Sequence, residues 1–212
     1  MTGCLDGGVR LWDVAASNRV DEFVAISRFV ADRIRKYYRR EAQVIYPPVE
    51  WSQYEIAASP EQDFYLVVSA NAPYKRLDIV LEAFRDLDRH VKIVGHAPAG
   101  EAAKSRRGAL GNVEWLGWRS DAEICELYAN CRALLFPGTE DFGLVPVEVQ
   151  AAGRPVIAYG RGGVLESVRG ISVKEAGRTD KGSWERGCTG IFFQEPTAKA
   201  LAEAIACFES VE

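Results

Sequence analysis

Two glutamates lie in a segment whose residue types could bind both a sugar and an anion. Glu140 and Glu148 are eight residues apart in the run 136–148, which reads FPGTEDFGLVPVE. We expect this run to lead from a buried strand into a short helix, with Glu140 in the loop and Glu148 one to two turns into the helix. Parallel α/β sheets bind ligands at the edge where their strands end, and a helix N-terminus there attracts phosphate.

The residues between the glutamates suit the same chemistry. Gly143 allows the backbone to approach a ligand closely, and the amides near Phe142, Gly143 and Leu144 are expected to point from the helix start toward an anion. Glu148 can accept two hydrogen bonds from the neighbouring hydroxyls of a ribose. Glu140 can hold sugar hydroxyls or stabilise positive charge at an anomeric carbon. A single glutamate is usually a surface charge, but the strand-end context favours a functional role for this pair.

Two cations follow another strand end. Lys75 and Arg76 lie between the apolar run 64–68 and a helix expected to begin near Leu77. Positive side chains at a helix start add to the positive end of its dipole, and they can neutralise a diphosphate leaving group. The alternative is a basic pair that faces solvent. If the functional interpretation is right, both cations and both glutamates converge at the carboxyl edge of one sheet.

Two further strand-end turns could complete such a site. Gly117, Trp118 and Arg119 follow the strand expected at 113–116, where main-chain groups can bind a flat base and Trp118 or Arg119 can cover it. The alternative is a tight turn with Trp118 packed on a neighbour. The glycine-rich turn at 160–163 can close the phosphate side of the site, although a plain structural turn explains it equally well.

Composition excludes several functional classes. The chain has 212 residues, 48% hydrophobic and 26% charged, which suits one or two globular domains. A net charge of -4 disfavours non-specific nucleic-acid binding, because phosphate backbones are met by surplus Lys and Arg. The basic cluster at 33–40 indicates either a solvated helix face or peripheral contact with an acidic membrane surface. Apolar runs stay well short of the ~20 residues that span a bilayer.

Cysteine and histidine usage favours a reduced, cytoplasmic protein without a metal site. The five cysteines include no Cys-x-x-Cys pair, and the two histidines, His90 and His96, are not at a ligand spacing.

Strand and helix patterns alternate along the chain. Short, mostly apolar runs predict strands at 23–26, 44–46, 64–68, 91–94, 113–116, 132–136, 155–158 and 191–193. Strands without apolar–polar alternation are buried on both faces, as in a parallel sheet. Helical spacing and cap residues predict helices at 27–38, 77–87, 101–110, 120–129, 145–152, 163–168 and 197–208. The predicted fold is therefore α/β, a Rossmann-like doubly wound parallel sheet of about six strands with helices on both faces. The glycine-rich segment 169–189 is expected to be a long loop.

These features together resemble the donor-binding half of retaining GT-B glycosyltransferases of family four, closest to the mannosyltransferase-like branch. The matching stretches are 23–27, 44–48, 73–78, 113–117 and 136–163. The resemblance implies that Glu148 binds the nucleotide ribose, that Glu140 contacts the transferred sugar and that Lys75 binds the diphosphate. It also implies a reaction without a metal cofactor.

The resemblance sets the expected domain organisation and function. Residues 1–9 are expected to be disordered or tag-like, 10–46 a remnant of a preceding acceptor domain and its linker, and 47–212 the nucleotide-sugar-binding domain. The full enzyme would transfer a hexose, with mannose from GDP-mannose the best candidate, to a glycan or lipid-linked acceptor held by the N-terminal domain. The fragment alone is expected to transfer little.

Three departures leave alternatives open. Relatives often carry an arginine where this chain has Ala70, the loop at His96 lacks the usual acidic residue and glycines, and nearly all of the acceptor domain is missing. A non-catalytic nucleotide-binding module, or an orphan half that pairs with a separate acceptor-domain chain, is therefore the main rival. A dehydrogenase-type Rossmann domain is disfavoured because no GxGxxG follows a strand.

Overall fold

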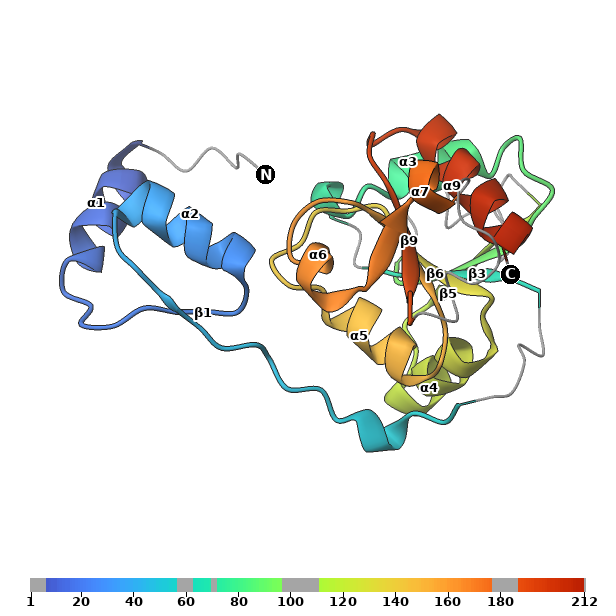
Figure 1. Ribbon diagram of the computed structural model, residues 1–212, viewed down its shortest axis with the longest axis horizontal. Coiled ribbons are helices and arrows are strands. Elements are labelled where there is room, and N and C mark those ends of the chain that lie inside the picture. Colours follow the sequence, from blue (N-terminus) through green and yellow to red (C-terminus); the bar gives the residue numbers. More distant parts are fainter. Residues whose placement is uncertain (1–6, 57–62, 70–71, 97–110, 177–186, 212) are drawn as a thin grey trace. The chain divides into compact units, whose positions relative to one another are not determined.

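The computed structural model describes residues 7–56, 63–69, 72–96, 111–176 and 187–211 (Figure 1). The chain divides into two compact units, Met1–Pro48 and Val49–Glu212. This division falls two residues after the boundary expected from the sequence. The helix expected at 101–110 and the departure at Ala70 lie outside the described residues.

The described part of the smaller unit, residues 7–48, contains two helices and one pair of short parallel strands. Its elements are α1 (Gly7–Ser17), β1 (Val24–Ala25), α2 (Arg28–Tyr38) and β2 (Gln43–Val44). Ser27 caps α2 by accepting a hydrogen bond from the Val30 amide at 3.0 Å, as the sequence predicts. The Tyr38 hydroxyl donates to Asp13 at 2.7 Å and ties α2 to α1. Residues 7–9, expected to be loose chain, instead form the first turn of α1.

The larger unit is built on a seven-stranded, wholly parallel sheet with the order β5-β4-β3-β6-β7-β9-β8. The strands are β3 (Tyr65–Val68), β4 (Val91–Val94), β5 (Val113–Gly117), β6 (Ala133–Phe136), β7 (Val156–Tyr159), β8 (Gly170–Ser172) and β9 (Gly190–Phe193). The doubly wound parallel fold is confirmed. The seventh strand, β8, corrects the expectation of a loop over 169–189. It was missed because its sequence, Gly-Ile-Ser, has no apolar run, and its strand character comes from pairing with β9.

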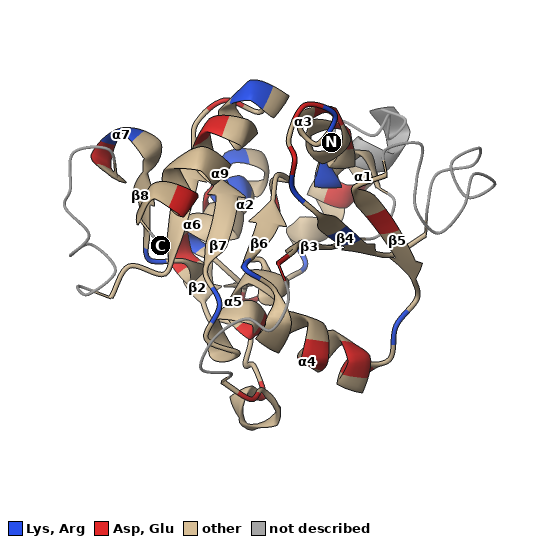
Figure 2. Ribbon diagram, turned by 90° about the vertical axis from the view of Figure 1, so that its right-hand side faces the viewer, with Lys and Arg blue, Asp and Glu red and all other residues tan. Residues whose placement is uncertain are grey.

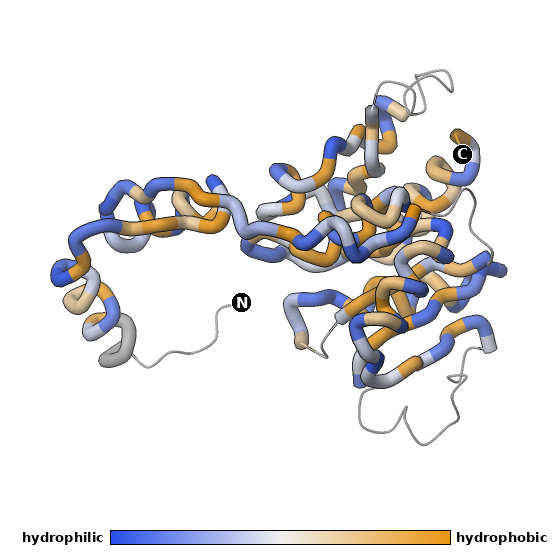
Figure 3. Tube along the Cα trace, turned by 90° about the horizontal axis from the view of Figure 1, so that it is seen from below, coloured by the Kyte–Doolittle hydropathy of each residue, from blue (hydrophilic) through white to orange (hydrophobic). Residues whose placement is uncertain are grey.

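Helices cover both faces of this sheet (Figure 1). They are α3 (Leu77–Ala83), α4 (Asp121–Asn130), α5 (Leu144–Ala151), α6 (Val164–Ser167), α7 (Val173–Ala176) and α9 (Ala198–Val211), with the 3-10 turns η1 (Trp51–Gln53) and η2 (Pro73–Lys75). Successive residues of β3 face opposite ways. Tyr65 packs in one hydrophobic cluster with residues of α3 and α9, and Leu66 packs in a second cluster with residues of α4 and α5. Figure 3 shows hydrophobic stretches alternating with hydrophilic ones along the chain.

The strand order reverses direction between β3 and β6. From β3 the chain proceeds outward to β4 and β5, and it then returns to add β6 on the other side of β3. Connections of the two halves therefore leave the sheet on opposite faces, which opens a space at the carboxyl ends of β3 and β6. The two loops that follow these strands carry Lys75 and Glu140, so the topology brings the two predicted site segments together.

Candidate functional site

Lys75 and Glu140 form an ion pair at the point where the strand order reverses. Lys75 ends the turn η2 after β3, and Glu140 lies in the loop between β6 and α5. The Lys75 Nζ contacts Oε1 of Glu140, and only 15% and 19% of the two side chains are exposed. Low exposure limits screening by solvent, so this pair is stronger than an ordinary surface ion pair. Two residues 65 positions apart are thus held in one place.

Gly138 permits this close approach and was not identified from the sequence. A Cβ atom on Gly138 would lie 2.7 Å from the Tyr74 carbonyl oxygen and 3.0 Å from the Lys75 Cα atom. Any side chain there would push the two loops apart. The only sequence signal is the Pro-Gly dipeptide directly after the strand, which by itself indicates no more than a turn.

The glycine-rich turn after β7 supports the same loop from the other side. The Gly163 amide donates to the Glu140 carbonyl oxygen at 2.9 Å. A Cβ atom on Gly163 would lie 2.3 Å from the Asp141 carbonyl oxygen, and Gly162 has a φ of +89°. The turn at 160–163 therefore fixes the backbone that presents Glu140.

Glu148 lies on α5, as the sequence predicts, and is hydrogen-bonded to a tyrosine. The Tyr128 hydroxyl donates to Glu148 Oε2 at 2.8 Å. Tyr128 is 1% exposed, and its burial, followed by the Glu148 charge, raises the pKa of its hydroxyl well above the usual range. The hydroxyl is therefore always a donor. Sequence reasoning missed Tyr128 because a tyrosine on a helix face usually indicates only core packing.

The start of α5 offers backbone rather than side-chain groups. Gly143 is the N-cap residue, with a φ of +89°, and no side chain of a described residue caps the helix. Phe142 is 8% exposed and packs inside, whereas Leu144 is 44% exposed. Any contribution of this segment to an anion site would therefore come from main-chain amides.

Arg76 is not brought to the Lys75–Glu140 pair. Its guanidinium forms a two-pronged ion pair with Asp78 in the first turn of α3, at 2.9–3.1 Å, and donates to the Pro196 carbonyl oxygen at 3.4 Å. The hydrogen bond from Arg76 lowers the pKa of Asp78. Arg76 also lies in the left-handed region of the backbone map, with a φ of 54°. Arg39, with a φ of 56°, is the other non-glycine residue of the described chain that does so. The two adjacent cations thus have different surroundings.

The turn after β5 exposes Trp118, whereas Gly117 and Arg119 are partly buried. The Gly95 amide donates to the Gly117 carbonyl oxygen at 2.9 Å, and Gly117 has a φ of +72°. Arg119 donates to the Trp118 carbonyl oxygen at 2.8 Å and lies 3.6 Å from Glu123. Trp118 is 74% exposed, which contradicts the alternative in which its ring packs on a neighbour. The ring is free to cover a ligand.

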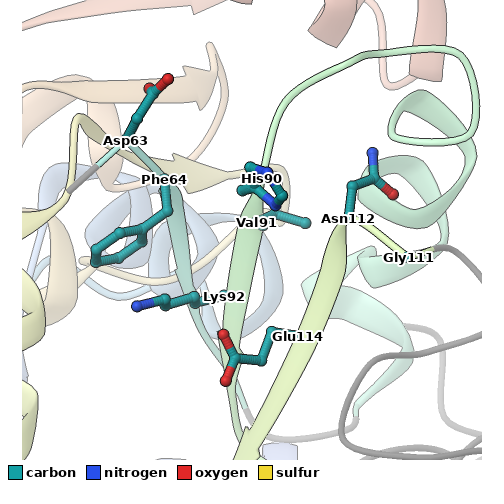
Figure 4. Close-up of a pocket in the computed structure, with 8 residues that line it drawn as sticks. All are labelled: Asp63, Phe64, His90, Val91, Lys92, Gly111, Asn112 and Glu114. Atoms are coloured by element: carbon teal, nitrogen blue, oxygen red, sulfur yellow. The ribbon is translucent and has the colours of Figure 1, made fainter.

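A separate pocket of about 140 Å³ lies at the opposite, amino edge of the sheet (Figure 4); it is lined by Asp63, Phe64, His90, Val91, Lys92, Gly111, Asn112 and Glu114. The Lys92 ammonium lies 4.1 Å from the centre of the Phe64 ring. The side-chain amide nitrogen of Asn112 donates hydrogen bonds to three backbone carbonyl oxygens. None of the predicted site residues lines this pocket.

Two other properties of the described residues bear on function. They contain no group of three or more His, Cys, Asp or Glu side chains placed to hold a metal ion. None of their helices is long and apolar enough to cross a membrane. In Figure 2, Lys and Arg are interspersed with Asp and Glu over the ribbon.

The fold and the loops at its carboxyl edge are those of the Rossmann-like α/β class. The family "Glycosyl transferases group 1" matches residues 52–212, so the chain belongs to this family. It is 29% identical over 156 residues to "Uncharacterized glycosyltransferase MJ1178" of Methanocaldococcus jannaschii, covering 72% of this chain and 44% of that protein. It is 31% identical over 166 residues to the D-inositol 3-phosphate glycosyltransferase of Mycobacterium marinum, covering 70% and 36%.

Solved structures share the fold. Sucrose-phosphate synthase from Thermosynechococcus elongatus superposes with a TM-score of 0.74 at 22% identity, over 97% of this chain and 53% of that one. Anabaena Alr3699/HepE in complex with UDP-glucose gives a TM-score of 0.72 at 23% identity, over 95% and 58%. These likenesses show the GT-B Rossmann-like fold. The chain spans less than half of the two curated relatives named above and somewhat more than half of these structures.

Proposed function

We propose that the larger unit is the donor-binding domain of a retaining glycosyltransferase that uses a nucleotide sugar. The observation that carries the proposal is the Lys75–Glu140 pair at the reversal of strand order, with Glu148 on the helix that follows. A cation, an uncapped helix start and two carboxylates at this edge suit a ligand with a diphosphate between two sugars. Membership of the glycosyl transferase group 1 family supports the same reading.

Each residue has a distinct role in this proposal. An ammonium group has three N–H donors, so Lys75 can keep its bond to Glu140 and still donate to diphosphate oxygens. With the amides at the start of α5, Lys75 would offset the charge that develops on the diphosphate as its bond to the sugar breaks. Glu140 would hold the transferred sugar, Glu148 the ribose, and Gly117, Trp118 and Arg119 the base. Arg76 would act indirectly, by fixing the start of α3.

We propose that the transferred group is a hexose, with mannose from GDP-mannose as the first candidate. We also propose that the reaction uses no metal cofactor. The structure of Anabaena Alr3699/HepE was solved with UDP-glucose, so UDP sugars belong in the same test. We propose a glycan or lipid-linked acceptor that is bound by a preceding domain, of which residues 10–46 are the tail. Location in the cytoplasm, with contact to the inner membrane face through the basic cluster 33–40, completes the proposal.

Calorimetry with GDP, UDP, GDP-mannose and UDP-glucose, in the presence of a chelator, tests the donor assignment. We expect saturable binding of at least one of the four, and weaker binding by Lys75→Met. Lys92→Met is the matched control, because it removes one lysine at the amino edge of the same sheet and should leave binding unchanged. Failure of all four ligands to bind would end the donor-domain assignment. Binding without transfer after addition of an acceptor domain would favour a non-catalytic module.

A further inference from the structure

We propose that Tyr128 is a positioning residue that fixes the Glu148 carboxylate for recognition of a ribose. The inference rests on the proposed function, because it assumes that Glu148 contacts the nucleotide. Its basis is the 2.8 Å hydrogen bond from the Tyr128 hydroxyl to Glu148 Oε2, which joins α4 to α5.

Tyr128 itself cannot move easily. It is 1% exposed, and the Tyr54 ring packs against its ring at a centroid distance of 5.9 Å. A buried hydroxyl requires a hydrogen-bond partner, and here that partner is a carboxylate. Since the hydroxyl stays protonated, it donates one hydrogen bond, and Glu148 accepts it. The bond therefore selects one orientation of an otherwise flexible glutamate.

The orientation leaves the other carboxylate oxygen for a ligand. Among the residues that the structure describes, Oε1 of Glu148 makes no hydrogen bond, while Oε2 is occupied by Tyr128. An ionised carboxylate can accept about four hydrogen bonds in all. Glu148 can therefore accept bonds from the ribose hydroxyls while Tyr128 keeps it in place.

The same helix also carries the turn proposed to bind the base. α4 begins directly after Gly117, Trp118 and Arg119, where Ser120 and Glu123 form a capping box. Tyr128 follows Ser120 by eight residues, which is about 12 Å along an α-helix. One rigid helix thus connects the base turn at its start with the partner of the ribose carboxylate near its end. Base and ribose contacts are coupled through α4.

Ribose discrimination by a Tyr128→Phe variant provides the test. The first probe is GDP or UDP, whichever binds more tightly. Its affinity is compared with those of its 2′-deoxy and 3′-deoxy forms by calorimetry. The unaltered chain should prefer the ribonucleotide, because its carboxylate loses partners when a hydroxyl is missing. Removing one hydrogen bond to a charged group should reduce that preference by about 10-fold in Tyr128→Phe. Phe keeps the buried ring, so the core remains packed.

Tyr65→Phe is the matched control. Tyr65 is also fully buried, and its hydroxyl donates to another glutamate, Glu209, at 2.9 Å. Loss of that bond should lower thermal stability to a similar degree without changing ribose preference. In a Glu148→Gln background, Tyr128→Phe should have no further effect on the preference, because the two residues act as one unit.

The outcomes separate the inference from the function on which it rests. A preference for ribose that survives Tyr128→Phe would overturn the positioning role and leave the donor-domain assignment intact. Equal weakening of ribo- and deoxynucleotides would also overturn it, since that pattern indicates a merely structural tyrosine. If the unaltered chain binds nucleotides without any ribose preference, both the role of Glu148 and that of Tyr128 are wrong.

Discussion

Replacing Gly138 by alanine should loosen the Lys75–Glu140 site while the fold persists. The added Cβ atom would lie 2.7 Å from the Tyr74 carbonyl oxygen, whereas ordinary contacts begin at 3.4 Å. One of the two loops must therefore shift by about 0.7 Å. Gly138 does not have a positive φ, so the effect comes from this contact and not from backbone strain.

The structure sets the size of the effect. Inserting one carbon into a closely packed site costs about 1–3 kcal/mol, and the reduced freedom of the unfolded chain returns about 0.4–1 kcal/mol. For a unit of this size, each 1 kcal/mol lowers the melting temperature by about 2–4 °C. A displaced Lys75 would lose a charge-assisted contact to the diphosphate worth about 1.5–3 kcal/mol, so nucleotide affinity should fall about 10- to 100-fold.

Thermal unfolding and nucleotide calorimetry on the same samples measure both effects. Gly111→Ala is the matched control, because a Cβ atom at Gly111 meets no heavy atom within 4 Å. It should change neither melting temperature nor affinity appreciably. Unchanged nucleotide affinity in a folded Gly138→Ala variant would refute the argument that the close approach of these loops builds the site.

Three further substitutions test other features of the structure. Lys75→Met should weaken binding of a nucleoside diphosphate at least about 10-fold, whereas Arg76→Met should change it less than about 3-fold, because Arg76 is held by Asp78; calorimetry showing the larger loss for Arg76 would reverse these roles. The hydrogen bond from the Arg89 guanidinium is the main reason why the pKa of Glu209 lies below the usual glutamate value. The ionised Glu209 carboxylate therefore stabilises the fold above the usual glutamate pKa, and this stabilisation is lost as the pH falls through the lowered pKa. Glu209→Gln should therefore cost about 1–2 kcal/mol at neutral pH in urea unfolding, with a difference that shrinks below about pH 4; a difference that stays constant in acid would contradict this linkage.

Local sequence patterns were sufficient for most of the sheet. Strands buried on both faces are mostly apolar along their length, so the apolar runs in the larger unit marked six of the seven strands of its sheet. The capping box at Ser120 marked the start of α4 for an equally local reason, because cap residues bond to amides within their own turn. The edge strand β8 has no such signature, since pairing with β9 is what makes it a strand.

The sequence by itself determined which residue types stand in the segments that follow the strands, including Lys75 and Glu140 in two loops and Glu148 on the helix α5. Only the tertiary structure decided their partners: Lys75 pairs with Glu140, and Tyr128 holds Glu148. The reason is that strand periodicity and helix caps are read from neighbours in the chain. Which loops meet depends on the order of strands in the sheet. The role of a small residue such as Gly138 therefore becomes clear only from the contact between two backbone segments that are distant in the sequence.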